Sequence, residues 1–547
     1  MRPVPFRELR APALLFAALG ALLFAPVLFL GRTLVATDFL HASPFWRAEP
    51  GPLRNPLLSD TAEHYYPAEV LSSKAAKEGR IPLVDPYSFN GTPVPHGIHI
   101  WNSVWPVKLA FLLAFDPVRS YDLYAIAHWW LAAVAMTALL RALGASPFAA
   151  LAGALAYALS ARSAAWLHGH YLMTTLAYAP LAFLTAGLRS ALAPIPVAGL
   201  FFTNPHAGLA TAAVLLFIDR RSWRTSLWGL LLAGVALVPL AGVVLGGIRH
   251  PSVEAAAFYQ EGFRCWGLLF DFVAPGLWKG TMTRNEYAVY VGLLPFAGAV
   301  AAARRGGFWT WLAVVPVVFG TLYPLPVWVA PVSFSLPTRY LFLSTLATCV
   351  LFARALDARS LGSWARSAVL VVVALDLAPR FLAHNGAYDA APLRERPPIV
   401  DVLRGPGRVG YELADHPQMG GRPVTPPLGI LGVPSVQGYS VMVPKPHAEA
   451  LAGAGEVRGD RLVRLTDPEH PALDGLGMRW FVTDRPYAAR RFRKLESPPG
   501  LHVYENPDWK DVPPRGPRRG LLWIGLGVTL AACLGAVLDC LRRRGYS

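Results

Sequence analysis

Long apolar runs dominate the pattern along this chain, and charged residues or Pro and Gly bound each run. Two examples are "APALLFAALGALLFAPVLFL" (11–30) and "LLWIGLGVTLAACLGAVLDC" (521–540). Each has about the 20 residues that a helix needs to cross the hydrocarbon core of a bilayer. We therefore expect a mainly α-helical, polytopic membrane protein. The predicted spans, about twelve in number, are 11–30, 121–143, 147–167, 171–188, 193–203, 206–218, 226–248, 287–303, 308–323, 336–356, 363–383 and 520–541.

The least regular part of this pattern is the pair of short runs at 193–203 and 206–218. The letters "TNPH" (203–206) interrupt the apolar sequence between them. The two runs form either two short crossings or one broken or re-entrant element. A broken element is tolerated only where protein or water covers the freed backbone groups.

The distribution of arginine predicts the orientation, because short cytoplasmic loops collect Lys and Arg. With a cytoplasmic N-terminus and two passes between 193 and 218, the basic residues between spans fall inside. Twelve spans also return the C-terminus to the cytoplasm. The residues concerned are Arg141, Arg189, 219–224, Arg304, Arg305, Arg354, Arg359, Arg366 and 542–544.

This topology leaves three large segments outside, at 31–120, 249–286 and 384–519. The last is rich in Pro, Gly and charge and contains the strand-like runs "MRWFVTD" (478–484) and "LHVYEN" (501–506). It is long enough for a small α/β or β-rich extracytoplasmic domain. We therefore divide the chain into three parts. They are a transmembrane domain (1–383) with a long first loop (31–120), an extracytoplasmic domain (384–519), and a last helix with a cytoplasmic tail (520–547).

Composition supports a membrane protein and narrows its partners. Of the residues, 54% are hydrophobic and 15% charged, and mean hydropathy is +0.38, whereas soluble domains are about a quarter charged. The net charge of +16 follows from cytoplasmic arginines and attraction to anionic lipid, and no nucleic-acid motif accompanies it. We expect a lipid bilayer as partner and no nucleic acid. The four cysteines have neither disulfide nor zinc spacing, and the N-terminal apolar run lacks a cleavage site and predicts a retained anchor.

Ionisable and polar residues gather at the predicted outer ends of the spans. Charged groups at membrane depth are costly and often functional, so a shared side is informative even where each residue alone is weak evidence. The candidates are Asp38, Asp60, Glu63, His64, Asp85, His168, His170, Asn204, His206, Glu254, Glu261, Arg264, Asp271, Glu286 and Arg339.

The densest group lies in "SDTAEHYYP", within the first loop. Asp60, Glu63 and His64 are spaced i, i+3, i+4 and would share one face of a helix. That face can hold a divalent metal ion or a substrate hydroxyl. The alternative is a solvated first turn beside two tyrosines of the interfacial aromatic belt.

Two further groups allow a structural or a functional interpretation. "HGH" places His168 and His170 at i, i+2, which permits metal ligation without fixing a third ligand and favours polar interface residues. "DPYSFNGTP" (85–93) is dense in turn formers and predicts an ordered turn more than a site. Asp376, inside a predicted span, is either a helix-packing group or part of a cavity.

The run "SDTAEHYYPAEVLSSKAAKEGRIPLVDPYSFNGTPV" (59–94) resembles the first outer loop of bacterial YfhO-like membrane proteins. That loop has an Asp, an aromatic-Pro pair and then "G-x-x-P-L-W-N-P-Y-x-x-x-G-x-P", and here Val84-Asp85 replaces the usual Trp-Asn. Later matching pieces follow in order, so the resemblance covers nearly the whole chain. They are "NEYAVYVGLLP" (285–295), "LPTRYLFL" (336–343), "VQGYSVMVPKPHAEAL" (436–451), "LGMRWFVTD" (476–484) and "VYENP" (503–507).

YfhO-like proteins look like members of the GT-C superfamily of membrane glycosyltransferases. The resemblance implies a multi-pass protein of the bacterial cytoplasmic membrane whose active site faces the extracytoplasmic side. It implies transfer of a sugar from a polyprenyl-phosphate donor to a cell-envelope glycan or protein, with Asp60 or Asp38 in the first loop as catalytic base. A transporter or flippase of lipid-linked glycan, and a non-catalytic envelope assembly protein, are the alternatives.

Such a transfer needs a carboxylate to take the acceptor proton and cations or a metal to stabilise the departing phosphate. No cofactor motif is present, and a divalent metal held by Asp60, Glu63 and His64 is possible. Some of the other outer-end groups, together with Lys279, are candidates for substrate or phosphate binding, with Arg able to bind phosphate bidentately. They are Arg339, Arg264, Lys279, His170, His168, Glu286, Asp85 and His206.

Overall fold

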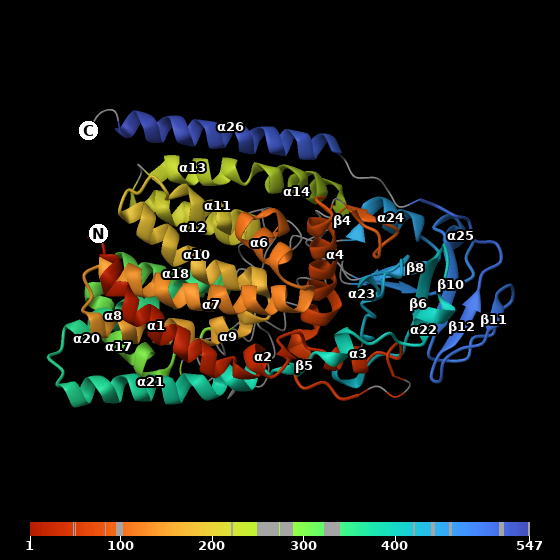
Figure 1. Ribbon diagram of the computed structural model, residues 1–547, viewed down its shortest axis with the longest axis horizontal. Helices are drawn as coiled ribbons and strands as arrows, with labels where there is room; N and C mark the ends of the chain where they lie inside the picture. The colour runs from red at the N-terminus through yellow and green to blue at the C-terminus, as the bar shows by residue number, and fades with distance from the viewer. Residues whose placement is uncertain are drawn as a thin grey trace.

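The chain folds into a long helical body with a smaller α/β part at one end (Figure 1). Both termini lie at the opposite end of the helical body. The computed structural model describes residues 1–47, 49, 51–82, 84–93, 102–219, 222–248, 273, 288–321, 340–419, 422–438, 443–458, 462–513 and 519–544.

The helices of the body lie side by side along its long axis, apart from α6, which is seen nearly end-on in Figure 1. Local signals start several of them: Asp116 precedes α7, and its carboxylate accepts hydrogen bonds from the Val118 and Arg119 N–H groups. The helices are α1 (Phe6–Leu23), α2 (Ala25–Phe29), α6 (Pro106–Ala114), α7 (Pro117–Ala142), α8 (Pro147–Ala158), α9 (Ala161–Leu167), α10 (His170–Gly187), α11 (Pro194–Thr203), α12 (Pro205–Ile218), α13 (Trp223–Leu232), α14 (Gly234–Gly246), α17 (Leu293–Gly306), α18 (Phe308–Thr321), α20 (Leu341–Asp357), α21 (Ser363–His384) and α26 (Arg519–Arg544).

Length and composition identify α7 and α21 as helices that can cross a membrane. The pair α8 and α9, bent by 48°, is a third candidate if it forms one span. Further apolar helices within the described ranges are shorter, with 10–17 residues. A mainly helical membrane fold is therefore confirmed, and the number of twelve crossings stays a prediction.

Large apolar side chains point outward along the helical body. Leu375 on α21, Trp311 on α18 and Leu530 on α26 are each at least 60% exposed. Exposing such an apolar surface to water costs free energy, whereas contact with lipid tails does not. The helical body is thus built to face lipid around its sides.

The region 193–218 forms two helices, α11 and α12, that pack against each other. The break falls at Asn204, whose side-chain oxygen accepts a hydrogen bond from the Ala207 N–H. At about 1.5 Å per residue the helices are roughly 15 and 21 Å long, short of the roughly 30 Å hydrocarbon core. These lengths favour the broken element over two full crossings. A re-entrant element returns the chain to its starting side, as two crossings do, and leaves the arginine pattern unaffected.

The first loop forms ordered structure between the bundle and the α/β part. α4 runs across the direction of the bundle helices (Figure 1). The elements of the first loop include β1 (Arg32–Thr33), α3 (Asp38–His41), a π-helical turn (Thr61–Tyr65), α4 (Tyr66–Lys77), β2 (Val84–Asp85) and β3 (Thr92–Pro93). β1 pairs antiparallel with β5 (Tyr388–Asp389), which follows α21. The start of the first loop is therefore paired with the segment that follows α21.

The α/β part contains a four-stranded mixed sheet in the order β11-β12-β10-β6. β10 pairs antiparallel with β12 and parallel with β6. The strands predicted in 478–484 and 501–506 are confirmed as β10 and β12. The strands of this sheet are β6 (Arg408–Glu412), β10 (Met478–Thr483), β11 (Arg493–Leu495) and β12 (His502–Glu505). A hairpin is formed by β8 (Gly455–Arg458) and β9 (Leu462–Leu465), and β7 (Val443–Pro444) pairs with β4 (Gly247–Ile248). The short helices are α22 (Ile399–Val402), α23 (Leu428–Leu431), α24 (Lys445–Ala450) and α25 (Ala472–Gly475).

The close approach of α26 to α14 gives a stability test. A Cβ on Gly525 would lie 2.6 Å from the Gly234 carbonyl oxygen, whereas a Cβ on Gly527 would meet nothing within 4 Å. We expect Gly525→Ala to destabilise the protein by about 1–3 kcal/mol, since overpacking forces the helices apart. Gly527→Ala is the matched control and should be neutral or slightly stabilising. The measurement is the thermal unfolding midpoint in detergent, and equal midpoints for the two variants would contradict the packing.

Candidate functional site

The aspartate favoured by the sequence, Asp60, lies where the first loop meets α10. Its Oδ2 accepts a hydrogen bond from the Tyr65 hydroxyl at 3.2 Å, and the Tyr65 and Tyr171 hydroxyls are 3.1 Å apart. Tyr171 is the second residue of α10. The carboxylate of Asp60 is therefore held toward the turn that contains "HGHY", and it is half-buried.

The second candidate, Asp38, is the first residue of α3. Its Oδ2 accepts a hydrogen bond from the Arg54 N–H at 2.7 Å, and its Oδ1 is buried with no hydrogen-bond partner among the described residues. Burial raises the pKa of Asp38, and the Arg54 N–H opposes that shift. Because α3 packs against the π-helical turn, Asp38 and Asp60 lie on neighbouring elements.

The predicted common face of Asp60, Glu63 and His64 does not form a metal cluster in the described part of the chain. The residues from Thr61 to Tyr65 take a π-helical turn, a form that often marks functional sites. The Glu63 carboxylate is fully buried and binds Arg422, while that of Asp60 meets Tyr65. No group of three or more His, Cys, Asp or Glu side chains within the described ranges has metal-site geometry. Metal binding stays a prediction.

His168 anchors the backbone of the first loop. It is buried, and its Nδ1 lies 2.6 Å from the Leu34 carbonyl oxygen, so this nitrogen is the donor. The Tyr121 hydroxyl donates to the backbone oxygen of His168. His170 begins α10, and His206, half-buried, is the second residue of α12. Phosphate binding by these histidines stays a prediction.

Asp85 has the geometry of a turn residue, as its sequence context predicts. Its Oδ1 accepts a hydrogen bond from the Tyr87 N–H at 2.9 Å. The following turn includes Phe89 and Asn90 with φ of 49° and 61°, a left-handed conformation that Asn tolerates better than Phe. Burial raises the pKa of Asp85, with the Tyr87 N–H opposing it.

Several candidates lie outside the described residues, and their roles stay predictions. They are Arg339, Arg264, Lys279, Glu286, Glu254, Glu261 and Asp271.

Some buried charged groups were missed by the sequence interpretation. Asp122 in α7 accepts hydrogen bonds from the Thr33 hydroxyl and the Leu34 N–H at 3.0 and 2.8 Å, fixing the start of the first loop. Arg162 in α9 is fully buried, with its guanidinium 4.9 Å from the Trp166 ring. Both are charged residues inside predicted spans, a signal that was available.

A second missed feature is the buried ion pair between Lys108 and Glu69, 2.7 Å apart. Both side chains are only 2% exposed, and the ammonium also lies 4.4 Å from the Tyr124 ring centre. The partners are 39 residues apart, on α6 and α4, so no local spacing could have revealed the pair. It joins α4 and α6, two helices of the first loop.

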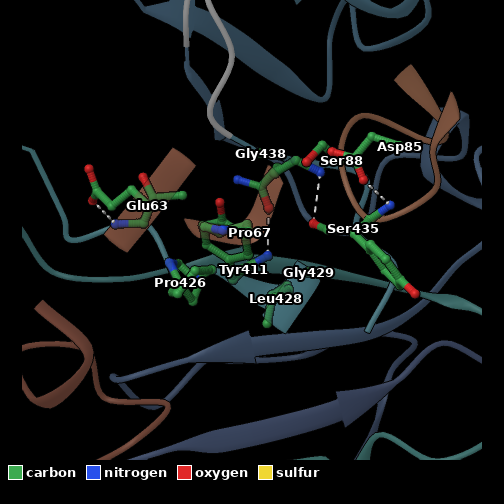
Figure 2. Close-up of a pocket in the computed structure, with 14 residues that line it drawn as sticks. Glu63, Pro67, Asp85, Ser88, Tyr411, Pro426, Leu428, Gly429, Ser435 and Gly438 are labelled. Carbon is green, nitrogen blue, oxygen red and sulfur yellow. Dashed lines mark hydrogen bonds between the residues drawn. The ribbon is translucent and has the colours of Figure 1, made fainter. Parts of the chain in front are cut away.

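A small cavity lies between the first loop and the α/β part (Figure 2). Glu63 and Asp85 line it from the loop, and Tyr411 and Gln437 from the α/β part. Its volume is about 30 Å³, enough for one or two water molecules but not for a sugar ring. The cavity is therefore a feature of the interface between the first loop and the α/β part.

Comparison with known proteins supports the fold. No protein-family model and no curated protein sequence matches the chain. Among solved structures, arabinofuranosyltransferase AftD from mycobacteria matches 93% of this chain with a TM-score of 0.50 and 14% identity. The chain spans 40% of the length of that structure. The chain thus shares the fold of the part of that structure that it matches, and the resemblance to YfhO-like proteins is not confirmed.

The partly buried carboxyl of Asp38 predicts a pH-dependent gain in stability when its charge is removed. Because its folded-state pKa is raised, the ionised form costs free energy that is absent at low pH and grows as the pH rises above the unfolded pKa. Asp38→Asn should therefore unfold at a higher temperature than the wild type near pH 7, and this advantage should vanish in acid. Melting curves at several pH values test this. An advantage that is constant with pH would contradict a charge effect.

Proposed function

We propose that this protein is a membrane glycosyltransferase that moves a sugar from a polyprenyl-phosphate donor to a cell-envelope acceptor. The site would face the extracytoplasmic side of a bacterial cytoplasmic membrane. The observation that carries the proposal is the presence of two aspartates on adjacent elements of the first loop in a GT-C-like fold. The likeness to an arabinofuranosyltransferase supports sugar transfer as the class of reaction.

In the proposed reaction, an Asp carboxylate takes the proton of the acceptor hydroxyl as that oxygen attacks the anomeric carbon. The bond from this carbon to the phosphate oxygen breaks, and the lipid phosphate leaves as an anion. Asp60 is the main candidate base because it is half-buried and oriented by the Tyr65 hydroxyl. Asp38 is the rival, with one carboxylate oxygen buried without a hydrogen-bond partner among the described residues.

Cations must stabilise the departing phosphate in a site that excludes water. Arg339 and Arg264 are proposed for this role from the sequence alone. The donor's prenyl chain would lie against the apolar outer surface of the helices, which already faces lipid. The α/β part would help to bind the acceptor.

The proposal predicts that Asp60→Asn lowers the transfer rate by about 100-fold or more, in line with the loss of a general base. Asp38→Asn is tested separately, and the exposed Glu78→Gln in the same loop is the control. The measurement is transfer of radiolabelled sugar from a polyprenyl-phosphate donor to envelope acceptor by the purified protein in liposomes.

Full activity in both aspartate variants would contradict the catalytic assignment. Movement of a lipid-linked glycan across the bilayer without any acceptor would instead identify a flippase. Rescue of a deletion strain by the Asp38→Asn, Asp60→Asn double variant would identify a non-catalytic assembly protein.

A further inference from the structure

One segment of the α/β part lies along the first loop, beside both candidate aspartates. We call residues 416–419 and 422–425 the strap. At its first half, the Gln418 side chain accepts a hydrogen bond from the Leu53 N–H at 2.8 Å and donates one to the Leu53 carbonyl oxygen at 3.0 Å. Leu53 directly precedes Arg54, whose N–H binds Asp38. The strap thus contacts the loop next to the first aspartate.

The second half of the strap binds next to the other aspartate. The Arg422 guanidinium donates to both oxygens of Glu63, at 3.1 and 2.9 Å, and the Thr425 N–H donates to the same carboxylate at 2.6 Å. Glu63 is the third residue of the π-helical turn that Asp60 precedes. Two parallel guanidinium bonds fix the orientation of a carboxylate as well as its position. The turn is therefore fixed from the α/β side.

Packing continues from the strap into α4. α23, which follows the strap, packs against α4, the helix that continues the π-helical turn. Phe45 of the first loop also contacts Tyr411 of β6, with ring centres 6.2 Å apart. The bidentate pair is thus the charged centre of a larger contact between the loop and the α/β part.

We propose that Glu63 and Arg422 are a positioning pair, through which the α/β part holds the Asp60-bearing turn in its reactive geometry. This inference rests on the proposed function of Asp60. A base must be held within hydrogen-bond reach of the proton that it removes, and small displacements are costly to the rate. Glu63 does not touch substrate in this scheme, and its carboxylate is occupied by Arg422 and Thr425.

The sharpest test replaces Arg422 with Lys, which keeps the positive charge near Glu63 but loses the bidentate geometry. Arg491→Lys is a matched control. Arg491 also binds a carboxylate bidentately, that of Asp474, with both distances 2.8 Å and an exposure of 25% against 23% for Arg422. That pair lies within the α/β part, so its loss should leave the first loop unchanged.

Two readouts are measured on the full-length protein in liposomes. The first is kcat and KM for the polyprenyl-phosphate donor: we expect Arg422→Lys to lower kcat about tenfold or more with little change in donor KM. The second is hydrogen exchange of the backbone amides in residues 57–66, which should become faster in Arg422→Lys. Arg491→Lys should show neither change. Because a loss of folded protein also lowers the apparent kcat at unchanged KM, kcat is expressed per folded molecule. A merely structural role of Arg422 would lower the amount of folded protein and leave this kcat unchanged.

The outcomes separate the two proposals. Wild-type exchange at 57–66 in Arg422→Lys overturns the positioning pair, whatever the activity. Faster exchange with unchanged kcat also overturns it, because the turn then moves without consequence for the reaction. If the wild type transfers no sugar and exchange still responds to Arg422→Lys, the coupling stands as a structural fact, but the proposed function falls and the catalytic role falls with it.

Discussion

The arrangement of the proposed site depends on the buried ion pair between Glu63 and Arg422. A carboxylate that is completely shielded from water is costly unless charge and hydrogen bonds replace its hydration. Here the guanidinium and the Thr425 N–H together supply three hydrogen bonds. The docked α/β part therefore stabilises the first loop in this conformation. Correct folding of one part is a condition for the geometry of the other.

The other side of the loop is fixed by the helical body in the same manner. Asp122 of α7 and His168 of the turn before α10 bind the two backbone polar groups of Leu34. Asp122 accepts from the N–H, and the His168 ring donates to the carbonyl oxygen. Because Leu34 is fully enclosed, both of its backbone polar groups need such partners. The loop is thus bound by side chains on both faces.

The side chains that bind the first loop differ from the two candidate catalytic aspartates. Glu63, His168 and Asp85 appear in the sequence as possible chemistry. In the structure the Glu63 carboxylate binds Arg422 and the Thr425 N–H, while one ring nitrogen of His168 and one carboxylate oxygen of Asp85 bind backbone groups. Asp60 and Asp38 remain partly exposed, and Asp38 retains a buried oxygen without a hydrogen-bond partner among the described residues. A site needs both kinds of residue, because a base is effective only when its surroundings are rigid.

The sequence by itself determined the helical membrane class, the break near Asn204, the turn after Asp85 and the strands β10 and β12. Each of these depends on hydropathy, periodicity or turn chemistry within a few neighbouring residues. Only the tertiary structure decided which side chains bind the first loop. Glu63 and Arg422 are 359 residues apart, and Lys108 and Glu69 are 39 apart, so no local pattern links them. Such pairs form because burial brings distant charges together, and burial is a property of the complete fold.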